Sequence, residues 1–333
     1  MTVSLSCDEV LKLMRSFQPT CVLAAAAELD IFTSLSGGSA NSADLSARLG
    51  TDLRATTILL DALTSLGFLM KENDEYRVPP GVAEMLSESS PTNILPGVRH
   101  QANGVRRWAQ LARVVQTGGP AECPPSVRGP DGDLASFIGA MENYSAPVAE
   151  QVIDKLRPLG FRHLLDIGAG PGTWTIALLR AVPNAIATVF DLPQVIPMAR
   201  QRIEQAGLIK RVSFVGGDYL SDDLPAGADF IWLSAIAHQN SREQNAALFA
   251  KIHKALSPGG TLAVRDVVMD ESRTGPQAGA LFAINMLVAT EHGNTYTFEE
   301  FRSDLAHAGF VNIELFYHDD AMNSLIRAQK LRT

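Results

Sequence analysis

The chain has 333 residues, of which 46% are hydrophobic and 19% charged, and its formal net charge is −8 at pH 7. This composition supplies enough apolar side chains for packed cores, most simply in two domains, and it excludes a largely disordered chain. The acidic balance argues against nucleic acid as the main partner, because phosphate backbones are bound by clustered lysine and arginine.

Cysteine usage and the N-terminal region both indicate a cytoplasmic protein. Cys7, Cys21 and Cys123 are far apart and odd in number, so they predict neither a disulfide framework nor a zinc site. The N-terminal region lacks the order of basic, apolar and small residues that marks a signal peptide. The alanine-rich run 22–27 is too short to span a bilayer, so we also expect no membrane partner.

The first ninety residues are predicted to be mainly helical. A long helix, two shorter helices and a two-stranded hairpin are expected at 10–35, 43–49, 51–66 and 68–78. Pro19 should break or kink the first helix, and Ser42 and Gly50 supply the cap residues of the second. The apolar composition around 22–29 favours a core position or a subunit interface.

Two helices followed by a hairpin are typical of a winged-helix domain, which binds DNA in some proteins and serves as a scaffold in others. The helix that would enter a DNA groove carries one basic residue, Arg54, and two acids, Asp52 and Asp61. A helix that binds in a DNA groove is richer in arginine and lysine, so we expect no nucleic-acid partner. A winged-helix regulator that senses a small ligand stays open as an alternative function.

The middle of the chain is predicted to be helical around one irregular loop. Helices are expected at 95–115 and 134–156, with a loop rich in glycine and proline at 118–133. Phe137, Met141 and Tyr144 fall near one face of the second helix. Such a face is either part of a core or the wall of a ligand pocket.

Residues 163–178, HLLDIGAGPGTWTIAL, predict a strand, a tight turn and a helix. The turn has the spacing G-x-G-x-G, formed by Gly168, Gly170 and Gly172. This combination is shaped for a nucleotide, because a helix N-terminus presents free N–H groups beside a backbone without Cβ atoms. Thr173 departs from the dinucleotide pattern G-x-G-x-x-G/A, which disfavours a nicotinamide dehydrogenase. Asp166 in the strand suits a cationic amine or sulfonium better than a pyrophosphate.

Strands and helices alternate from residue 161 onward. Strands are predicted at 164–167, 186–190, 212–215, 229–234, 261–268 and 313–316. This alternation predicts an open, mainly parallel sheet with helices on both faces and a ligand beyond the carboxyl ends of the strands. Polar residues stand at those ends, namely Asp166, Asp191, Asp218, Ser234, His238 and Asp266. Asp191 could accept both hydroxyls of a ribose, and Asp218 could accept from the amino group of an adenine.

The motifs LDIGAGPG, FDLP, VGGD and LSPGGTL, with a histidine after the fourth strand, resemble the plant caffeate-type and bacterial antibiotic O-methyltransferases. The resemblance covers almost the whole chain. It implies an α/β fold, in which a Rossmann-like methyltransferase domain with a mostly parallel sheet follows an α-helical winged-helix dimerisation domain. The implied segments are a dimerisation domain, a helical linker that lines the substrate pocket, and a methyltransferase domain, at 1–95, 96–160 and 161–333.

The resemblance also implies a homodimer that uses S-adenosyl-L-methionine, releases S-adenosyl-L-homocysteine and needs no metal. Cofactor contacts would come from Asp166, Gly168, Gly170, Gly172, Asp191, Leu192, Asp218, Tyr219 and Ser234. The pocket for the methyl acceptor would be formed by Phe137, Met141, Tyr144, Phe282, Asn285 and Met286. His238 would be the catalytic base with Asp266 beside it, because a histidine of near-neutral pKa can take a phenol proton as the methyl group is transferred.

The chain departs from the family pattern around the base. The family reads Leu-Lys-x-x-x-His-Asp-Trp where this chain reads LSAIAHQN, so Ser234 stands at the lysine position. A second carboxylate that flanks the base in the family falls within 293–297, GNTYT, which contains no acid. Glu291 and His292 are close in sequence and are the candidates to replace it.

We therefore expect methylation of an oxygen on a small hydroxylated, aromatic or polycyclic metabolite. The departures around His238 leave two alternatives open. One is methylation of carbon or nitrogen, and the other is a protein that binds the cofactor but carries out a different reaction, such as hydroxylation or decarboxylation.

Overall fold

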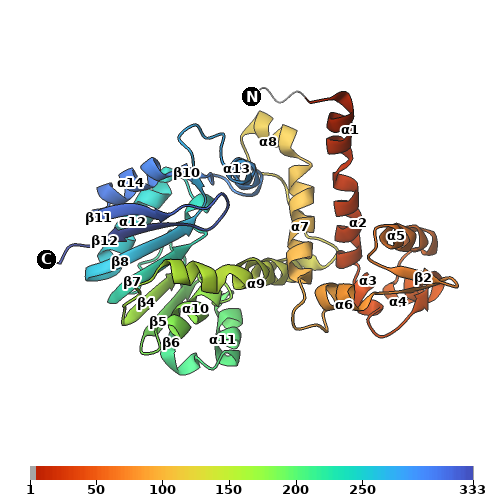
Figure 1. Ribbon diagram of the computed structural model, residues 1–333, viewed down its shortest axis with the longest axis horizontal. Helices are drawn as coiled ribbons and strands as arrows, with labels where there is room; N and C mark the ends of the chain where they lie inside the picture. The colour runs from red at the N-terminus through yellow and green to blue at the C-terminus, as the bar shows by residue number, and fades with distance from the viewer. Residues whose placement is uncertain (1–4, 333) are drawn as a thin grey trace. The chain divides into compact units, whose positions relative to one another are not determined.

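The computed structural model describes residues 5–332, which form two compact units (Figure 1). The first unit consists of the residues up to Ala109 together with Cys123–Asn143, and the second consists of Gln110–Glu122 and the residues from Tyr144 onward. The segment 96–160, expected to be a linker, is therefore divided between the two units. Among the described residues, no helix is long and apolar enough to cross a membrane.

The first unit is helical with one small sheet. Its elements are α1 (Cys7–Arg15), α2 (Phe17–Glu28), α3 (Ile31–Ser34), β1 (Ala40–Asn41), α4 (Ser42–Leu49), α5 (Leu53–Ser65), β2 (Met70–Glu72), β3 (Glu75–Arg77), α6 (Pro80–Leu86), α7 (Leu95–Trp108) and the first part of α9 (Gly129–Lys155). β3 pairs antiparallel with both β1 and β2. Phe32, Leu45, Leu60 and Leu63, all fully buried, form the centre of its core.

Helix boundaries in this unit follow from caps and proline. The helix expected over 10–35 is three helices, and Pro19 lies in the first turn of α2, where its missing N–H leaves no hydrogen bond unmade. Asn41, not Ser42, caps α4, and its side chain accepts a backbone N–H from the first turn at 2.9 Å. Gly50 ends α4 in the left-handed conformation at φ 65°.

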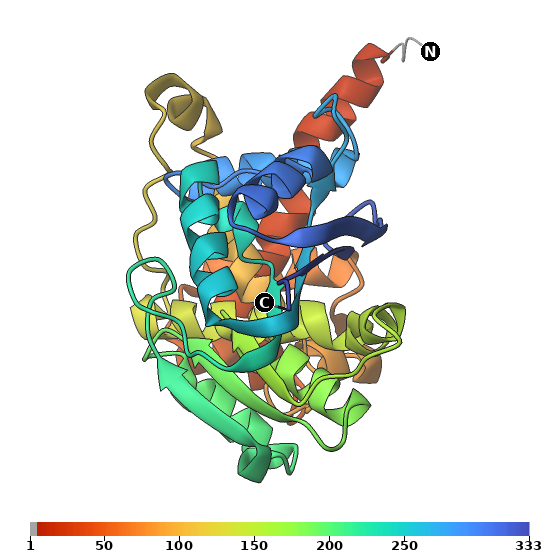
Figure 2. The same ribbon diagram turned by 90° about the vertical axis from the view of Figure 1, so that its left-hand side faces the viewer.

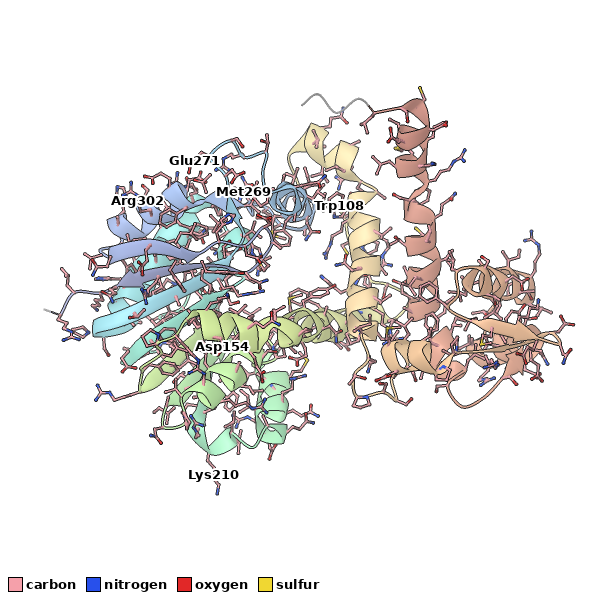
Figure 3. The ribbon with its side chains drawn as sticks, in the orientation of Figure 1. Trp108, Asp154, Lys210, Met269, Glu271 and Arg302 are labelled. Carbon is pink, nitrogen blue, oxygen red and sulfur yellow. The ribbon has the colours of Figure 1, made fainter. Side chains whose placement is uncertain are left out.

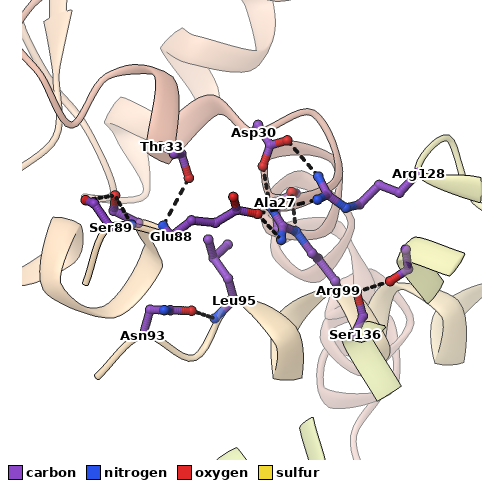
Figure 4. A network of polar contacts seen from close by, with 12 residues as sticks. Ala27, Asp30, Thr33, Glu88, Ser89, Asn93, Leu95, Arg99, Arg128 and Ser136 are labelled. Atoms are coloured by element: carbon purple, nitrogen blue, oxygen red, sulfur yellow. Dashed lines mark hydrogen bonds and ion pairs between the residues drawn. The ribbon is translucent and has the colours of Figure 1, made fainter. Parts of the chain in front are cut away.

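A buried arginine connects four segments of the first unit (Figure 4). Arg99 on α7 donates to the carbonyl of Ala27 at 3.0 Å and to Glu88 at 2.6 Å, and it also pairs with Asp30. Arg128 donates to the other oxygen of Asp30 at 2.6 Å. Because both cations are matched by carboxylates, their burial is compensated and the ends of α2, α7 and α9 are held together.

The N-terminal helix of this unit exposes apolar side chains. Val10, Leu11, Leu13 and Met14 of α1, together with Phe17 at the start of α2, are 44–69% exposed, and α1 contributes no residue to the core. A contiguous apolar surface of this kind is typical of an interface with another protein chain.

The second unit contains a seven-stranded sheet in the order β11-β12-β8-β7-β4-β5-β6 (Figure 1). The strands are β4 (His163–Ile167), β5 (Ile186–Asp191), β6 (Val212–Gly216), β7 (Ala228–Ser234), β8 (Leu256–Asp266), β11 (Val311–Tyr317) and β12 (Ser324–Gln329). The five strands from β4 to β8 are parallel, while β12 runs antiparallel to both β8 and β11. The predicted parallel sheet is confirmed, although β12 was not expected.

Helices cover both faces of this sheet. The helices of the second unit are α8 (Leu111–Thr117), the second part of α9, α10 (Thr173–Ala181), α11 (Ile196–Gln205), α12 (Arg242–Ala255), α13 (Gln277–Ala289) and α14 (Phe298–His307), with the 3-10 helices η1 (Ile209–Arg211) and η2 (Ala237–Gln239). α12 and α14 pack side by side on one face, and α9 and α10 pack on the other (Figure 2). Alternate residues of β7 divide accordingly, since Leu233 belongs to the first core and Trp232 to the second.

α13 packs beside the short parallel pair β9 (Val268–Met269) and β10 (Tyr296–Thr297). Gly279 allows this approach, because a Cβ there would lie 2.5 Å from the sulfur of Met269, a side chain that reaches toward α13 in Figure 3. In the same view, Lys210 on η1 points away from the sheet.

Candidate active site

In the glycine turn after β4, two glycines pack closely against neighbouring side chains and the third faces open space. Gly168, Gly170 and Gly172 all have positive φ, of 66°, 54° and 78°. A Cβ at Gly168 would lie 2.3 Å from Cδ1 of Ile236, and one at Gly172 would lie 2.9 Å from Cδ1 of Ile203. A Cβ at Gly170 would meet nothing within 4 Å. Two glycines are therefore required for packing, while the middle one faces open space where a ligand can lie against the backbone.

Asp191, at the end of β5, joins this turn to the neighbouring strand. Its Oδ2 accepts the N–H of Gly170 at 2.7 Å, and its Oδ1 accepts the N–H of Leu192 at 2.7 Å. Burial raises the pKa of the Asp191 carboxyl, and the two N–H donors act in the opposite direction. Each oxygen keeps a lone pair for a further donor, such as a hydroxyl, and Leu192 beside it is 40% exposed.

Asp166 is 1% exposed, so its carboxyl lies below the surface of the turn. Its Oδ2 accepts the hydroxyl of Thr175, on α10, at 2.5 Å. Burial raises the pKa of Asp166 to about 7, and the nearby charge of Asp191 acts in the same direction. The contact with Thr175 fixes α10 against the end of β4, directly behind the glycine turn.

The loop after β6 presents Asp218 and Tyr219. Oδ1 of Asp218 accepts the N–H of Leu220 at 2.8 Å, while its Oδ2 accepts no hydrogen bond from any of the residues 5–332. Tyr219 packs against the core under α12, and burial raises the pKa of its hydroxyl to about 12. Asp218 thus offers one carboxylate oxygen at the same end of the sheet as the glycine turn.

His238 and Asp266 meet at the ends of β7 and β8, although they are 28 positions apart in the chain. Nδ1 of His238 lies 2.7 Å from Oδ1 of Asp266, whose Oδ2 accepts the backbone N–H of His238 at 3.3 Å. The N–H of Val267 also donates to Oδ1 at 2.8 Å. This contact assigns the proton to Nδ1, so the unprotonated nitrogen of a neutral ring is Nε2. Within residues 5–332, Nε2 has no hydrogen-bond partner.

The other neighbours of His238 are apolar or neutral. The ring of Phe282, on α13, stands edge-on to the imidazole at 4.8 Å between centroids. The carbonyl of His238 accepts the N–H of Asn294 at 2.9 Å, so the segment 293–297 contacts the backbone of the base. Glu291 and His292 are exposed, and within residues 5–332 neither forms a hydrogen bond or ion pair with His238; Nε2 of His292 instead lies 3.8 Å from Oε2 of Glu291.

A buried arginine near these strand ends had no signal in the sequence. Arg265, the residue before Asp266, is 4% exposed, and its guanidinium lies over the ring of Trp174 at 4.6 Å. It donates to Oγ of Ser234 at 3.1 Å and to Oδ1 of Asn323 at 2.7 Å. Burial lowers the pKa of this guanidinium to about 10. The hydroxyl of Ser234 is therefore hydrogen-bonded to Arg265, on the face of the sheet that α10 covers.

The residues predicted to line an acceptor pocket are distributed over both units. In the first unit, Phe137 is 39% exposed and packs against His100 at 5.2 Å between ring centroids, close to Met141 in the chain. In the second unit, Tyr144 is 44% exposed and Asn285 is partly exposed. Met286 is only 6% exposed, so it contributes mainly to packing within α13 and its neighbours.

Comparison with known proteins decides the family. A sequence model for an O-methyltransferase domain matches residues 128–311, and one for an O-methyltransferase dimerisation domain matches residues 11–84. The chain belongs to the O-methyltransferase family. The expected resemblance and fold class are confirmed, and the protein is a methyltransferase.

Individual relatives share nearly the full length of this methyltransferase. It is 33% identical to 3-hydroxy-5-methyl-1-naphthoate 3-O-methyltransferase of Streptomyces sahachiroi, over 87% of this chain and 85% of that one. It is 32% identical to the tetracenomycin polyketide synthesis 8-O-methyl transferase TcmO of Streptomyces glaucescens, over 92% and 91%. Among solved structures, human N-acetylserotonin methyltransferase in complex with SAM aligns with a TM-score of 0.80 at 25% identity, covering 99% of this chain and 100% of that one.

Proposed function

We propose that this methyltransferase transfers the methyl group of S-adenosylmethionine to a hydroxyl oxygen of a small aromatic or polycyclic metabolite, with His238 as general base. The observation that supports this most directly is the pair of His238 and Asp266. The pair stands at the same end of the parallel sheet as the glycine turn, and its Nε2 is unoccupied by the described residues.

The residues at this end of the sheet fit the cofactor. The open side of Gly170 can accept the ligand against the backbone, and Asp191 can accept ribose hydroxyls with the lone pairs its two N–H contacts leave over. Oδ2 of Asp218 can accept from the adenine amino group, and Leu192 and Tyr219 offer apolar contact. Because Asp166 is buried against Thr175, we propose that it supports the glycine turn from below and acts on the cofactor through its charge.

When bound, the cofactor supplies an electrophilic methyl group on a sulfonium. His238 then takes the proton of the acceptor hydroxyl at Nε2, so that the oxygen gains charge as it attacks. Asp266 holds the imidazole in the required tautomer and stabilises the imidazolium that forms. Phe282 fixes the ring from its edge and excludes water from that side. The remaining contribution is the alignment of oxygen and methyl carbon, an orientation effect.

Two observations support an aromatic acceptor. Phe282 places an aromatic ring directly against the base, and α13, which carries it, is apolar over most of its surface. The relatives from Streptomyces are named for methylation of a hydroxynaphthoate and of a tetracenomycin polyketide, both polycyclic oxygen acceptors. We propose that Phe137, Met141 and Tyr144 contribute to recognition of a planar ring system of this class.

We also propose that the protein acts as a homodimer in the cytoplasm, with no nucleic-acid or membrane partner. The dimerisation-domain match over residues 11–84 covers the second half of α1 and all of α2, and the apolar side chains of α1 are exposed in the single chain. A second copy of the chain would bury them. Light scattering should give the mass of two chains, and the mass of one chain would contradict the proposal.

The experiment that tests the function has two stages. Calorimetry should show that purified protein binds S-adenosylhomocysteine with micromolar affinity and does not bind NAD. The protein is then incubated with methyl-labelled S-adenosylmethionine and a panel of 3-hydroxy-2-naphthoate, 1-hydroxyphenazine and N-acetylserotonin, and products are identified by mass spectrometry. Label on a phenolic oxygen supports the proposal. Label on carbon or nitrogen, or binding without any methyl transfer across the panel, would contradict it.

A further inference from the structure

Lys251, on α12, makes an unusual set of contacts that the proposed reaction does not use. Its ammonium donates to three backbone carbonyls of one loop, those of Tyr219 at 2.9 Å, Leu220 at 2.8 Å and Asp222 at 2.8 Å. The three donors of the ammonium are therefore all directed at the loop that follows β6. Three carbonyl dipoles that converge in this way repel one another unless a cation lies between them.

The rest of this loop is also internally bonded. The N–H of Asp218 donates to Oδ2 of Asp222 at 2.8 Å, and the N–H of Leu220 returns a hydrogen bond to Oδ1 of Asp218 at 2.8 Å. A Cβ at Gly217 would lie 2.7 Å from the ring of Phe190, so the start of the loop rests on the end of β5. Lys251 thus binds three carbonyls of the loop, and within residues 5–332 Oδ2 of Asp218 accepts no hydrogen bond.

We propose that Lys251 is a positioning residue for the adenine side of the cofactor site. It holds the loop 218–222 in one arrangement before the cofactor binds, so that Asp218 and Tyr219 need no reordering. This inference rests on the proposed function, because it assumes that Asp218 and Tyr219 contact the adenine. Preorganisation of this kind increases affinity by removing the entropic cost of ordering a loop on binding.

Two other lysines provide matched controls for the test. Lys330 makes the same kind of contact at a different place, since its ammonium donates to the carbonyls of His253 and Leu256, both at 2.7 Å, at the C-terminal end of α12. Lys254, on the same helix as Lys251, is 79% exposed and lies 3.5 Å from Asp223. K330M removes an ammonium from a carbonyl cluster that includes no residue of the loop 218–222. K254M removes an exposed ammonium.

Binding of S-adenosylhomocysteine and of adenosine is measured by calorimetry for the wild type and for K251M, K330M and K254M, together with the melting temperature of each. K251M should weaken both ligands by roughly tenfold, because adenosine retains the adenine. K330M should lower the melting temperature about as much as K251M does but leave both affinities within twofold of the wild type. K254M should change neither quantity. Hydrogen exchange of the amides at 218–222 should be faster in free K251M and return to the wild-type rate at saturating S-adenosylhomocysteine.

The outcomes separate this inference from the function on which it rests. Wild-type protein that does not bind S-adenosylhomocysteine overturns both. Normal wild-type binding with K251M affinity within twofold of it overturns only the role of Lys251, as does an equal loss of affinity in K330M. If K251M does not fold, K251Q takes its place, since glutamine keeps two donors but no charge. The same loss of affinity is expected there, and unchanged affinity in folded K251Q overturns the inference.

Discussion

Gly168→Ala and Gly170→Ala separate the two functions that the structure assigns to one glycine turn. Both residues have positive φ, so alanine at either position should lower the free energy of unfolding by about 1–2 kcal/mol through backbone strain alone. At Gly168 the added Cβ would also lie 2.3 Å from Cδ1 of Ile236, a side chain that is 7% exposed. Forcing that side chain aside adds about 1–3 kcal/mol. At Gly170 the Cβ enters open space, so only the strain remains.

The two variants should therefore rank differently in two assays. G168A should have the lower melting temperature in a calorimetric scan. G170A should fold almost normally but bind S-adenosylhomocysteine at least tenfold more weakly, because its Cβ occupies the space against which the ligand lies. Wild-type affinity in G170A would refute the placement of the cofactor, and a G168A variant as stable as G170A would refute the packing argument.

Three further predictions test individual contacts, the third with R211M as its control. D266N removes the carboxylate beside His238, so turnover should fall about a hundredfold while the affinity for S-adenosylhomocysteine stays within twofold; unchanged turnover would remove the pair from the mechanism. The pKa of Asp166 is raised from 3.8 to about 7 in the folded chain, so its ionisation destabilises the fold as pH rises. The melting temperature of the wild type relative to D166N should therefore fall between pH 4 and pH 7 and stay level above pH 7, and a difference independent of pH would contradict this. R265M should reduce turnover more than tenfold, because Arg265 holds Ser234 at the end of β7, four residues before His238. R211M removes a guanidinium from the carbonyls at and just after the end of α10, and it should lower only the melting temperature. Equal losses of turnover in the two variants would contradict a positioning role for Arg265.

Much of the fold followed from local patterns because those patterns have direct physical causes. Alternating strands and helices with a glycine turn after the first strand predict a parallel sheet with its site at one end. The meeting of His238 with Asp266 follows from this, since neighbouring parallel strands bring their carboxyl ends to the same edge. β12 was not predicted because its sequence, SLIRAQ, contains one β-branched residue and no aromatic one, so its composition does not favour a strand.

The features that were missed depend on tertiary contacts. α13 has apolar residues on all sides, so no helical periodicity identified it. The segment Pro258-Gly-Gly reads as a turn, but β8 begins at Leu256 and continues through it. Asp166 is buried against Thr175 because α10 packs beside β4, and Arg265 reaches Ser234 because β8 pairs with β7. The sequence spacing of these residues does not predict either contact.

The measurement that tests the central claim most directly compares H238A with the wild type for transfer of a labelled methyl group to whichever phenol of the acceptor panel is the best substrate. Binding of S-adenosylhomocysteine is measured in the same preparations. If His238 is the general base, turnover should fall by roughly a hundredfold or more while the dissociation constant stays within twofold. Turnover that is unchanged in H238A, with the cofactor still bound, would contradict the account.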